Sequence, residues 1–327
     1  MIIRRRDTLA LFATLGAAVR PGPAGAAETV VVYSAISTKV MQAFIEAFQK
    51  KNPALTVQVI SGGSGELLTR IKAEQKNPRG DIFSGPDADV FDGAIDLFAP
   101  YKSAEADGFD KSTADPQGRY YGFSTNFQVF IVNTKMMPFD KAPKTWTDLA
   151  KPEFKGKILM ANPAQSGSAF SQLHQIVGLH GWDLMDKIIV NATFVSSSKL
   201  AFQNVAKGEI PIGLTSEFNV VQSRDEGNPV EAIYPADGTA LINDANGLIK
   251  GGPNPAGAQT FLDFVNSKEA HQILVAIDKR RSARKDVAPP PGLPPVATIK
   301  AIPYDSIGAA KNHDAEIERF DQTFSRK

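Results

Sequence analysis

The chain has 327 residues, and its 36 lysines and arginines nearly balance its 35 aspartates and glutamates, which gives a formal net charge of +1. This balance argues against a nucleic-acid-binding protein that works through bulk charge, and against an acidic disordered chain. The absence of cysteine excludes disulfides, thiolate metal sites and cysteine nucleophiles. A chain of this length usually divides its hydrophobic core between two units.

The N-terminus has the three parts of a secretory signal peptide, which we assign to residues 1–26. Arginines at 4–6 form a positive region, and the apolar stretch at 9–19 is too short to span a bilayer. The small residues at 24–26 form a cleavage site. The arginines also resemble a twin-arginine signal, so the sequence leaves both export routes open. We therefore expect a bacterial protein that is exported to the periplasm.

The predicted elements after the signal alternate between strands and helices. A β-branched apolar run at 29–33 predicts a buried strand, and the apolar residues from 40 to 48 have helical spacing. A second strand is predicted at 55–60, followed by a turn at 61–66 that opens a helix, and a third strand at 81–83. This β-α-β-α-β order predicts a doubly wound α/β sheet.

Two longer apolar runs, at 127–132 and 241–249, predict strands that cross between two lobes. Another strand is predicted at 210–214, and helices are predicted after 166, around 201, over 260–277 and near the C-terminus. We therefore expect two α/β lobes that form a hinged clamp. The predicted N-lobe contains residues 27–124 and 243–279, and the predicted C-lobe contains residues 125–242 and 280–327.

Three loops at the carboxyl ends of predicted strands are rich in serine, threonine and glycine. They span 34–38, 61–65 and 166–168, and each leads into a predicted helix. Helix N-termini offer unpaired N–H groups and partial positive charge, so three of them aimed at one cleft would hold an anion. The alternative is that these residues only cap their helices. The predicted anion contacts are Ser34, Ser37, Thr38, Ser64, Gly65, Ser166, Gly167 and Ser168.

Acidic residues near strand ends are candidates for the opposite end of a ligand, where they would meet an amine or hydroxyl groups. The candidates are Asp87, Glu217, Asp237 and Asp244, and we predict the first three as ligand contacts. The alternative is an acid that complements a helix dipole. The four histidines include no pair with metal-binding spacing, so we predict neither a metal site nor a cofactor.

A set of short motifs along the mature chain resembles one protein family. The motifs are Tyr33-Ser34-Ala35, SGGSGELL at 61–68, TWTDL at 145–149, FKGK at 154–157, the segment 161–169, Arg280-Arg281 and the segment 302–305. With these motifs the sequence resembles the solute-binding proteins of bacterial ABC importers, in the extracellular family that includes ferric-iron-binding and 2-aminoethylphosphonate-binding members.

This resemblance implies a type II periplasmic-binding-protein fold, with two doubly wound α/β lobes joined by two hinge strands. It also implies that the lobes close on a small-molecule ligand and that the closed form docks on an inner-membrane ABC permease. We expect a monomer that binds no nucleic acid and has no enzymatic activity.

The ligand is a separate question, because members of the family differ in what they bind. Ferric-iron binders of the family use paired tyrosines after the strand that corresponds to 210–214, whereas residues 215–219 here read TSEFN. Fe³⁺ requires phenolate or carboxylate oxygens, and neutral hydroxyls do not replace them. The remaining resemblance is to the phosphonate and sugar-phosphate members. We therefore predict a phosphoryl-bearing organic anion, such as 2-aminoethylphosphonate or a sugar phosphate.

Several alternatives stay open from the sequence. One is a ferric-iron-binding protein of an iron importer, and another is a ligand without phosphate, such as a carboxylate or a polyamine. An alternative of another class is a periplasmic enzyme on the same scaffold. Such an enzyme would need a cysteine-bound cofactor or clustered histidines and carboxylates, which this sequence lacks.

Overall fold

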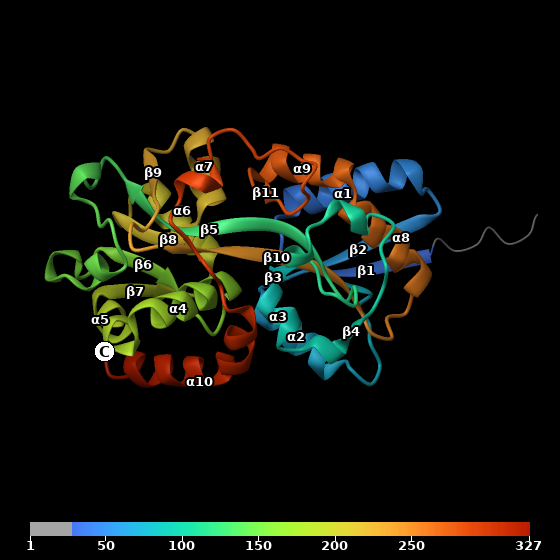
Figure 1. The fold of residues 1–327 in the computed structure, drawn as a ribbon, viewed down its shortest axis with the longest axis horizontal. Coiled ribbons are helices and arrows are strands. Elements are labelled where there is room, and N and C mark those ends of the chain that lie inside the picture. Colours follow the sequence, from blue (N-terminus) through green and yellow to red (C-terminus); the bar gives the residue numbers. More distant parts are fainter. Residues whose placement is uncertain (1–27) are drawn as a thin grey trace, which may run out of the picture.

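The computed structural model describes residues 28–327, so the predicted signal peptide lies outside the described chain. Two α/β lobes lie side by side in the described chain (Figure 1). Two long strands, β5 (Tyr121–Asn133) and β10 (Thr239–Ile249), run through the middle of the molecule and belong to both lobes. The predicted fold, two α/β lobes joined by two crossing strands, is therefore confirmed.

The N-lobe is built around parallel strands that alternate with helices. β1 (Glu28–Ser34) lies between β2 (Leu55–Ser61) and β3 (Ile82–Asp87), and it pairs with both in parallel. The amphipathic helix predicted after the first strand is α1 (Thr38–Lys51), which Ser37 caps. The other elements are α2 (Ser64–Ala73), α3 (Ala88–Asp92), β4 (Phe98–Ala99), α8 (Pro255–Asn266), α9 (Lys268–Asp278) and β11 (Arg281–Ser282).

The C-lobe repeats the same architecture. β6 (Ile158–Ala161) lies between β7 (Ala192–Val195) and β8 (Ile212–Ser216), and both pairings are parallel. Helices α4 (Gly167–His180) and α6 (Ser198–Lys207) each begin after one of these strands. The other elements are α5 (Trp182–Asn191), α7 (Glu217–Asp225), β9 (Val230–Ile233), β12 (Ala301–Ile302) and α10 (Ser306–Phe324).

The crossing strands connect the two sheets through backbone hydrogen bonds. The continuous strand order is β2-β1-β3-β10-β5-β8-β6-β7, in which β10 and β5 are antiparallel central neighbours. β10 also pairs with β3 of the N-lobe, and β5 also pairs with β8 of the C-lobe. Both strands extend beyond the predicted apolar runs, since β5 begins at Tyr121 in a polar stretch that the hydrophobic pattern does not mark.

The chain after α9 visits both lobes before it ends. β11 pairs with β5 at Ser124 and Thr125, and Arg284 then bonds to Glu105 and to the Asn266 carbonyl in the N-lobe. The chain next crosses to the C-lobe, where α10 packs against α4 and α5 (Figure 1). The predicted lobe limits stay a prediction, and this path shows that the chain leaves the N-lobe several residues after 280.

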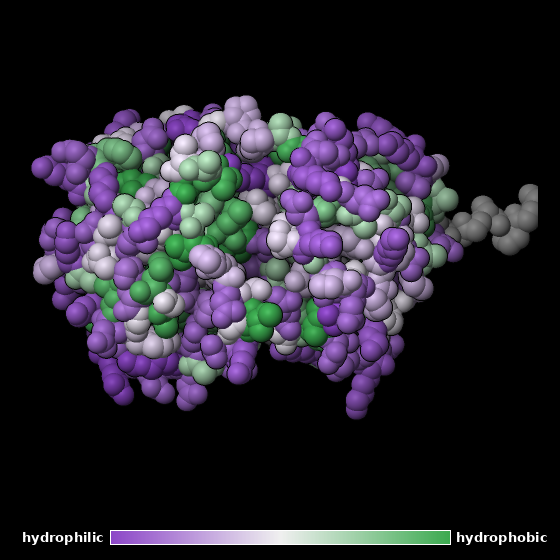
Figure 2. All heavy atoms as spheres, in the orientation of Figure 1, coloured by the Kyte–Doolittle hydropathy of each residue, from purple (hydrophilic) through white to green (hydrophobic). Residues whose placement is uncertain are grey.

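The face of the described chain seen in Figure 2 is mostly polar, and its outline is indented between α10 and the N-lobe at the lower edge. Among residues 28–327, the helices are all too short or too polar to cross a bilayer.

Each lobe has its own hydrophobic core, and in the N-lobe α1 supplies the central aromatic residues. Phe44 is fully buried, with its ring edge-on to Phe123 at 6.1 Å and to Phe264 at 6.2 Å. It thereby joins α1 to β5 and α8. A single ring thus couples a helix, a crossing strand and a C-terminal helix of the lobe.

We expect Phe44→Ala to destabilise the protein by about 3–5 kcal/mol, because the substitution leaves a cavity among rings that cannot collapse. Chemical denaturation measures this loss. Gln42→Ala on the exposed face of the same helix is the control, with an expected change within about 0.5 kcal/mol. Equal stability of the two variants would contradict the central position of Phe44.

Candidate functional site

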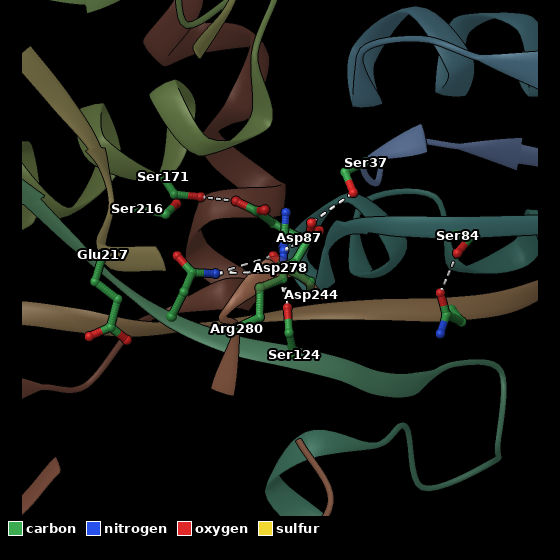
Figure 3. A network of polar contacts seen from close by, with 12 residues as sticks. Ser37, Ser84, Asp87, Ser124, Ser171, Ser216, Glu217, Asp244, Asp278 and Arg280 are labelled. Atoms are coloured by element: carbon green, nitrogen blue, oxygen red, sulfur yellow. Dashed lines mark hydrogen bonds and ion pairs between the residues drawn. The ribbon is translucent and has the colours of Figure 1, made fainter. Parts of the chain in front are cut away.

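The candidate site lies where the two lobes meet around β5 and β10. Figure 3 shows Asp87, Asp244, Asp278 and Arg280 gathered in one place, with Ser171 on one side and Ser37 on the other. These side chains come from both lobes and from the crossing strand β10. Most of them are buried, so each charge and donor there requires a partner.

The second and third predicted loops face each other directly across the lobes. A β-carbon placed on Gly63 would lie 3.1 Å from the Gln165 carbonyl oxygen. One placed on Gly167 would lie 3.3 Å from Ser64 Oγ, a tight contact that glycine avoids. The structure therefore brings the N-termini of α2 and α4 together, as the anion-cradle prediction requires.

Three serine hydroxyls form a triangle at the start of two helices. Ser166 Oγ lies 3.3 Å from Ser168 Oγ. Ser198 Oγ lies 2.6 Å from Ser166 Oγ and 2.7 Å from Ser168 Oγ. Ser166 also caps α4 by accepting from the Ala169 amide. Ser198 is the first residue of α6, so a third helix N-terminus joins those of α2 and α4. Ser198 is not among the predicted anion contacts.

The first predicted loop is used differently. Ser34 is buried at the end of β1, and its hydroxyl has no hydrogen-bond partner among the described residues. Ser37 caps α1 and donates a 2.8 Å hydrogen bond to Asp278, while Thr38 is exposed in the first turn. Of these three residues, Ser37 contacts the central acidic group rather than the serine triangle. Gly65, in the second loop, approaches the Ala164 carbonyl across the lobes.

Asp87 forms a buried carboxylate pair with Asp244. The two residues are opposite each other on β3 and β10, and the pairing of β10 with both neighbours becomes irregular beside Asp244. Such irregularities re-aim a side chain. Ser171 Oγ of α4 donates to Asp87. Burial, and then the charges of Asp244 and Asp89, raise the pKa of Asp87 well above its ordinary value.

Arg280 is the cation closest to this pair. Its Nη1 donates to Asp244 at 2.6 Å and to Ser124 at 3.3 Å, and its guanidinium lies 3.8 Å from the centre of the Phe218 ring. Its Nε lies 3.6 Å from Asp278 Oδ2, beyond hydrogen-bonding distance. That nitrogen and that oxygen are both buried without a hydrogen-bond partner among the described residues. The group thus contains three carboxylates for one guanidinium.

Glu217 is placed beside the site but is fully engaged within the protein. It is buried, and both of its oxygens accept from Arg281, at 2.7 and 3.0 Å. It also accepts from the Phe127 amide and from the Tyr234 hydroxyl. Figure 3 shows Glu217 apart from the central acids. Its predicted ligand contact stays a prediction, and these partners leave it little free acceptor capacity.

Asp237 is the predicted residue that the structure does not bring to the group. Its carboxylate accepts from the Trp146 amide at 3.0 Å and lies 2.9 Å from His180 Nε2. Trp146 is in the C-lobe core, and His180 is the last residue of α4. These contacts make Asp237 part of the C-lobe scaffold, and its role at the ligand stays a prediction.

Several polar residues at the site are not among the ligand contacts predicted from the sequence. Ser124, Asn126 and Gln128 alternate along β5, and Asn126 donates to Asp244 while Gln128 donates to Asn126. This period of two within an apolar strand was a usable signal for a polar face between the lobes. Arg280 belongs to one of the motifs that carry the family resemblance, but no local pattern indicates its contact with Asp244, and Ser171 carries no comparable signal.

We expect Glu217→Gln to lower the free energy of unfolding by about 3–5 kcal/mol, because it leaves the Arg281 guanidinium buried without its counter-charge. Chemical denaturation measures this, with Glu231→Gln in the exposed Arg224–Glu231 pair as a control that changes stability by less than about 1 kcal/mol. A variant with unchanged stability but weakened ligand binding would show instead that Glu217 serves the ligand.

Comparisons with known proteins place the chain in a family. Residues 30–276 match the family model described as a bacterial extracellular solute-binding protein. A Salmonella typhi protein, named as a candidate 2-aminoethylphosphonate-binding periplasmic protein, is 26% identical over 314 residues, which cover 88% of this chain and 87% of that protein. An Fe(3+)-binding periplasmic protein of Serratia marcescens is 23% identical over 266 residues, 77% of each chain.

Solved structures show the same fold. The periplasmic binding protein AfuA of Actinobacillus pleuropneumoniae, with fructose-6-phosphate bound, matches with a TM-score of 0.84 and 24% identity, over 91% of this chain and 99% of that chain. Iron-bound HitA of Pseudomonas aeruginosa matches with a TM-score of 0.80 and 20% identity, over 90% and 99%. The chain therefore belongs to the bacterial extracellular solute-binding protein family, and it is the solute-binding component of an ABC importer.

Proposed function

We propose that the ligand is a small organic molecule with a phosphoryl group at one end and an amine at the other. The observation that carries this proposal is the convergence of three helix N-termini beside a buried group of carboxylates. Helix N-termini suit an anion, and buried carboxylates suit a cation. A ligand with both charges, such as 2-aminoethylphosphonate, matches both features in one closed cleft.

The phosphoryl end would lie at the start of α2, α4 and α6. Ser64, Ser166, Ser168 and Ser198 supply hydroxyl donors there, and the helix N-termini add backbone donors and partial positive charge. Without a ligand the triangle hydroxyls bond to one another. A phosphoryl group would replace these contacts with stronger, charge-assisted hydrogen bonds.

The amine end would lie against Asp87, Asp244 and Asp278. Arg280 balances only one of these three carboxylates, so an ammonium group would reduce the remaining negative charge. Asp278 Oδ2 is buried without a donor, and it offers an acceptor for such a group. A sugar phosphate would use the same acceptors through its hydroxyl groups, and this is the second candidate.

The names of relatives support a phosphoryl ligand but also include iron. The Salmonella relatives are named for 2-aminoethylphosphonate and AfuA was solved with fructose-6-phosphate, whereas the Serratia relative and HitA are named for or contain iron. Two features of this chain speak against iron. Residues 215–219 contain no tyrosine, and the Glu217 carboxylate in that segment is bound to Arg281.

Capture follows from the position of the site between the lobes. The phosphoryl subsite and the amine subsite each combine residues of both lobes, so only the closed state makes all contacts with the ligand. A ligand shifts the equilibrium toward closure by its differential affinity for that state. The closed form would then be the one recognised by the permease in the inner membrane.

We expect 2-aminoethylphosphonate to raise the melting temperature of the mature protein by a few degrees. A ligand at 100 times its dissociation constant stabilises by about 2.7 kcal/mol. Thermal-shift measurements would compare it with ethylphosphonate, ethanolamine, hexose phosphates, and Fe³⁺ with a synergistic anion. A larger shift with the zwitterion than with either half-molecule supports the two-ended site. A shift with Fe³⁺ alone would refute the proposal.

We expect the double substitution Ser166→Ala and Ser168→Ala to weaken binding of 2-aminoethylphosphonate about 100-fold or more, because it removes two donors to a charged group. Titration calorimetry measures the affinity. Ser325→Ala at the exposed end of α10 is the matched control and leaves the affinity unchanged. Unchanged affinity in the double variant would move the phosphoryl subsite elsewhere.

A further inference from the structure

Two acidic residues of one N-lobe turn are inserted into the surface of the C-lobe. Asp87 ends β3 and Asp89 lies in α3, and both side chains are buried. Asp87 accepts from Ser171 of α4. Asp89 accepts a 2.6 Å hydrogen bond from the hydroxyl of Tyr304, which precedes α10. The partners that cover these carboxylates therefore belong to the opposite lobe.

The covering segment is firmly part of the C-lobe. Arg319 of α10 donates to Asp186 of α5 at 2.5 Å, His174 of α4 lies 3.0 Å from Glu316, and Phe320 is in the C-lobe core. The other face of α10 rests on α3, where a β-carbon on Gly93 would lie 3.4 Å from that of Ala310. Separation of the lobes must therefore uncover both carboxylates.

The described residues provide no direct ion pair for either carboxylate. The groups that face Asp87 are Ser171, Asp89 and Asp244, and Arg280 reaches it only through Asp244. The groups that face Asp89 are Tyr304 and, at longer range, Asp92, His313 and His174. His313 is half exposed and bonded to Asp314. Closure thus moves two acids from water into a site where neutral donors predominate.

We propose that closure of the ligand-free lobes is coupled to proton uptake at Asp87 and Asp89, so that acidic conditions favour the closed state of the protein without ligand. The ionised carboxylates lose their hydration on closure, and hydroxyl donors compensate only part of that loss. Protonation removes this cost. The pair thereby makes closure of the ligand-free lobes sensitive to the pH of the surroundings.

The direction of the pKa shifts agrees with this coupling. Burial is the main cause that raises the pKa of Asp89 from 3.8 to about 6, and burial also raises the pKa of Asp87. A group with a higher pKa in the closed state binds protons on closure, so closure strengthens as the pH falls. For Asp89 this occurs between pH 6 and its ordinary value near 4, and it amounts to at most about 100-fold. The pKa of Asp87 is raised in the same direction.

A distance measurement on ligand-free protein tests the proposal. The chain lacks cysteine, so Lys76→Cys and Lys187→Cys, which are exposed on the two lobes, would accept a pair of dyes. We expect energy transfer between the dyes to report a larger closed fraction at pH 5 than at pH 8. The double substitution Asp87→Asn and Asp89→Asn should remove this dependence and keep the lobes more closed at pH 8. Asp96→Asn, on the exposed N-lobe surface, is the control and should retain the dependence.

A second measurement covers the case in which the double variant fails to fold. Titration calorimetry of the unsubstituted protein with 2-aminoethylphosphonate, in two buffers of different ionisation enthalpy, gives the protons taken up on binding. The same titration with Asp89→Asn should give fewer protons. A closed fraction that does not change with pH, a double variant that responds like the control, or equal proton uptake in the two titrations would each overturn the proposal.

The coupling rests on the proposed capture by lobe closure, but not on the identity of the ligand. If 2-aminoethylphosphonate does not bind, the proposed ligand is wrong, and the distance measurement on ligand-free protein still decides the coupling. If it binds and closure does not respond to pH, only the coupling fails.

Discussion

The structure depends on two strands that are shared by both lobes. β5 and β10 pair with each other at the centre, and each continues into the sheet of a different lobe. Backbone hydrogen bonds of the two strands therefore fix how the lobes are connected, while side chains such as Ser171 and Tyr304 make hydrogen bonds across the cleft. This division allows the lobes to move about the strands without loss of either hydrophobic core.

The crossing strands also explain why the polar groups gather where they do. Alternate residues of β5 turn Ser124, Asn126 and Gln128 to one face, and the irregular pairing of β10 turns Asp244 toward the same region. Buried polar side chains at this position would weaken a simple core. Their hydrogen bonds to one another and to Asp244, which Arg280 also contacts, make the region a polar interior between the lobes.

Two neighbouring arginines near the hinge have different functions. Arg281 is held by both oxygens of Glu217 and also donates to the Pro294 carbonyl, so it joins α7, β11 and the tail. Arg280 points into the acidic group and keeps one buried nitrogen without a hydrogen-bond partner among the described residues. The contact of Arg281 with Glu217 stabilises the junction. Around Arg280, a buried nitrogen and the buried Asp278 Oδ2 stay without hydrogen-bond partners among the described residues. Two arginines that are adjacent in the sequence thus pair with different carboxylates, Arg281 with Glu217 and Arg280 with Asp244.

The sequence by itself determined the alternation of strands and helices, the two crossing runs and the serine-rich helix starts, because periodicity and capping are local properties. It also indicated Ser166 and Ser168, which lie at such a start. Only the tertiary structure decided which charges pair. Glu217 meets Arg281, Asp244 meets Arg280 and Asp87 meets Ser171, and the partners lie far apart in the chain. Whether an acid is buried, neutralised or free for a ligand depends on such distant neighbours, and no local pattern contains that information.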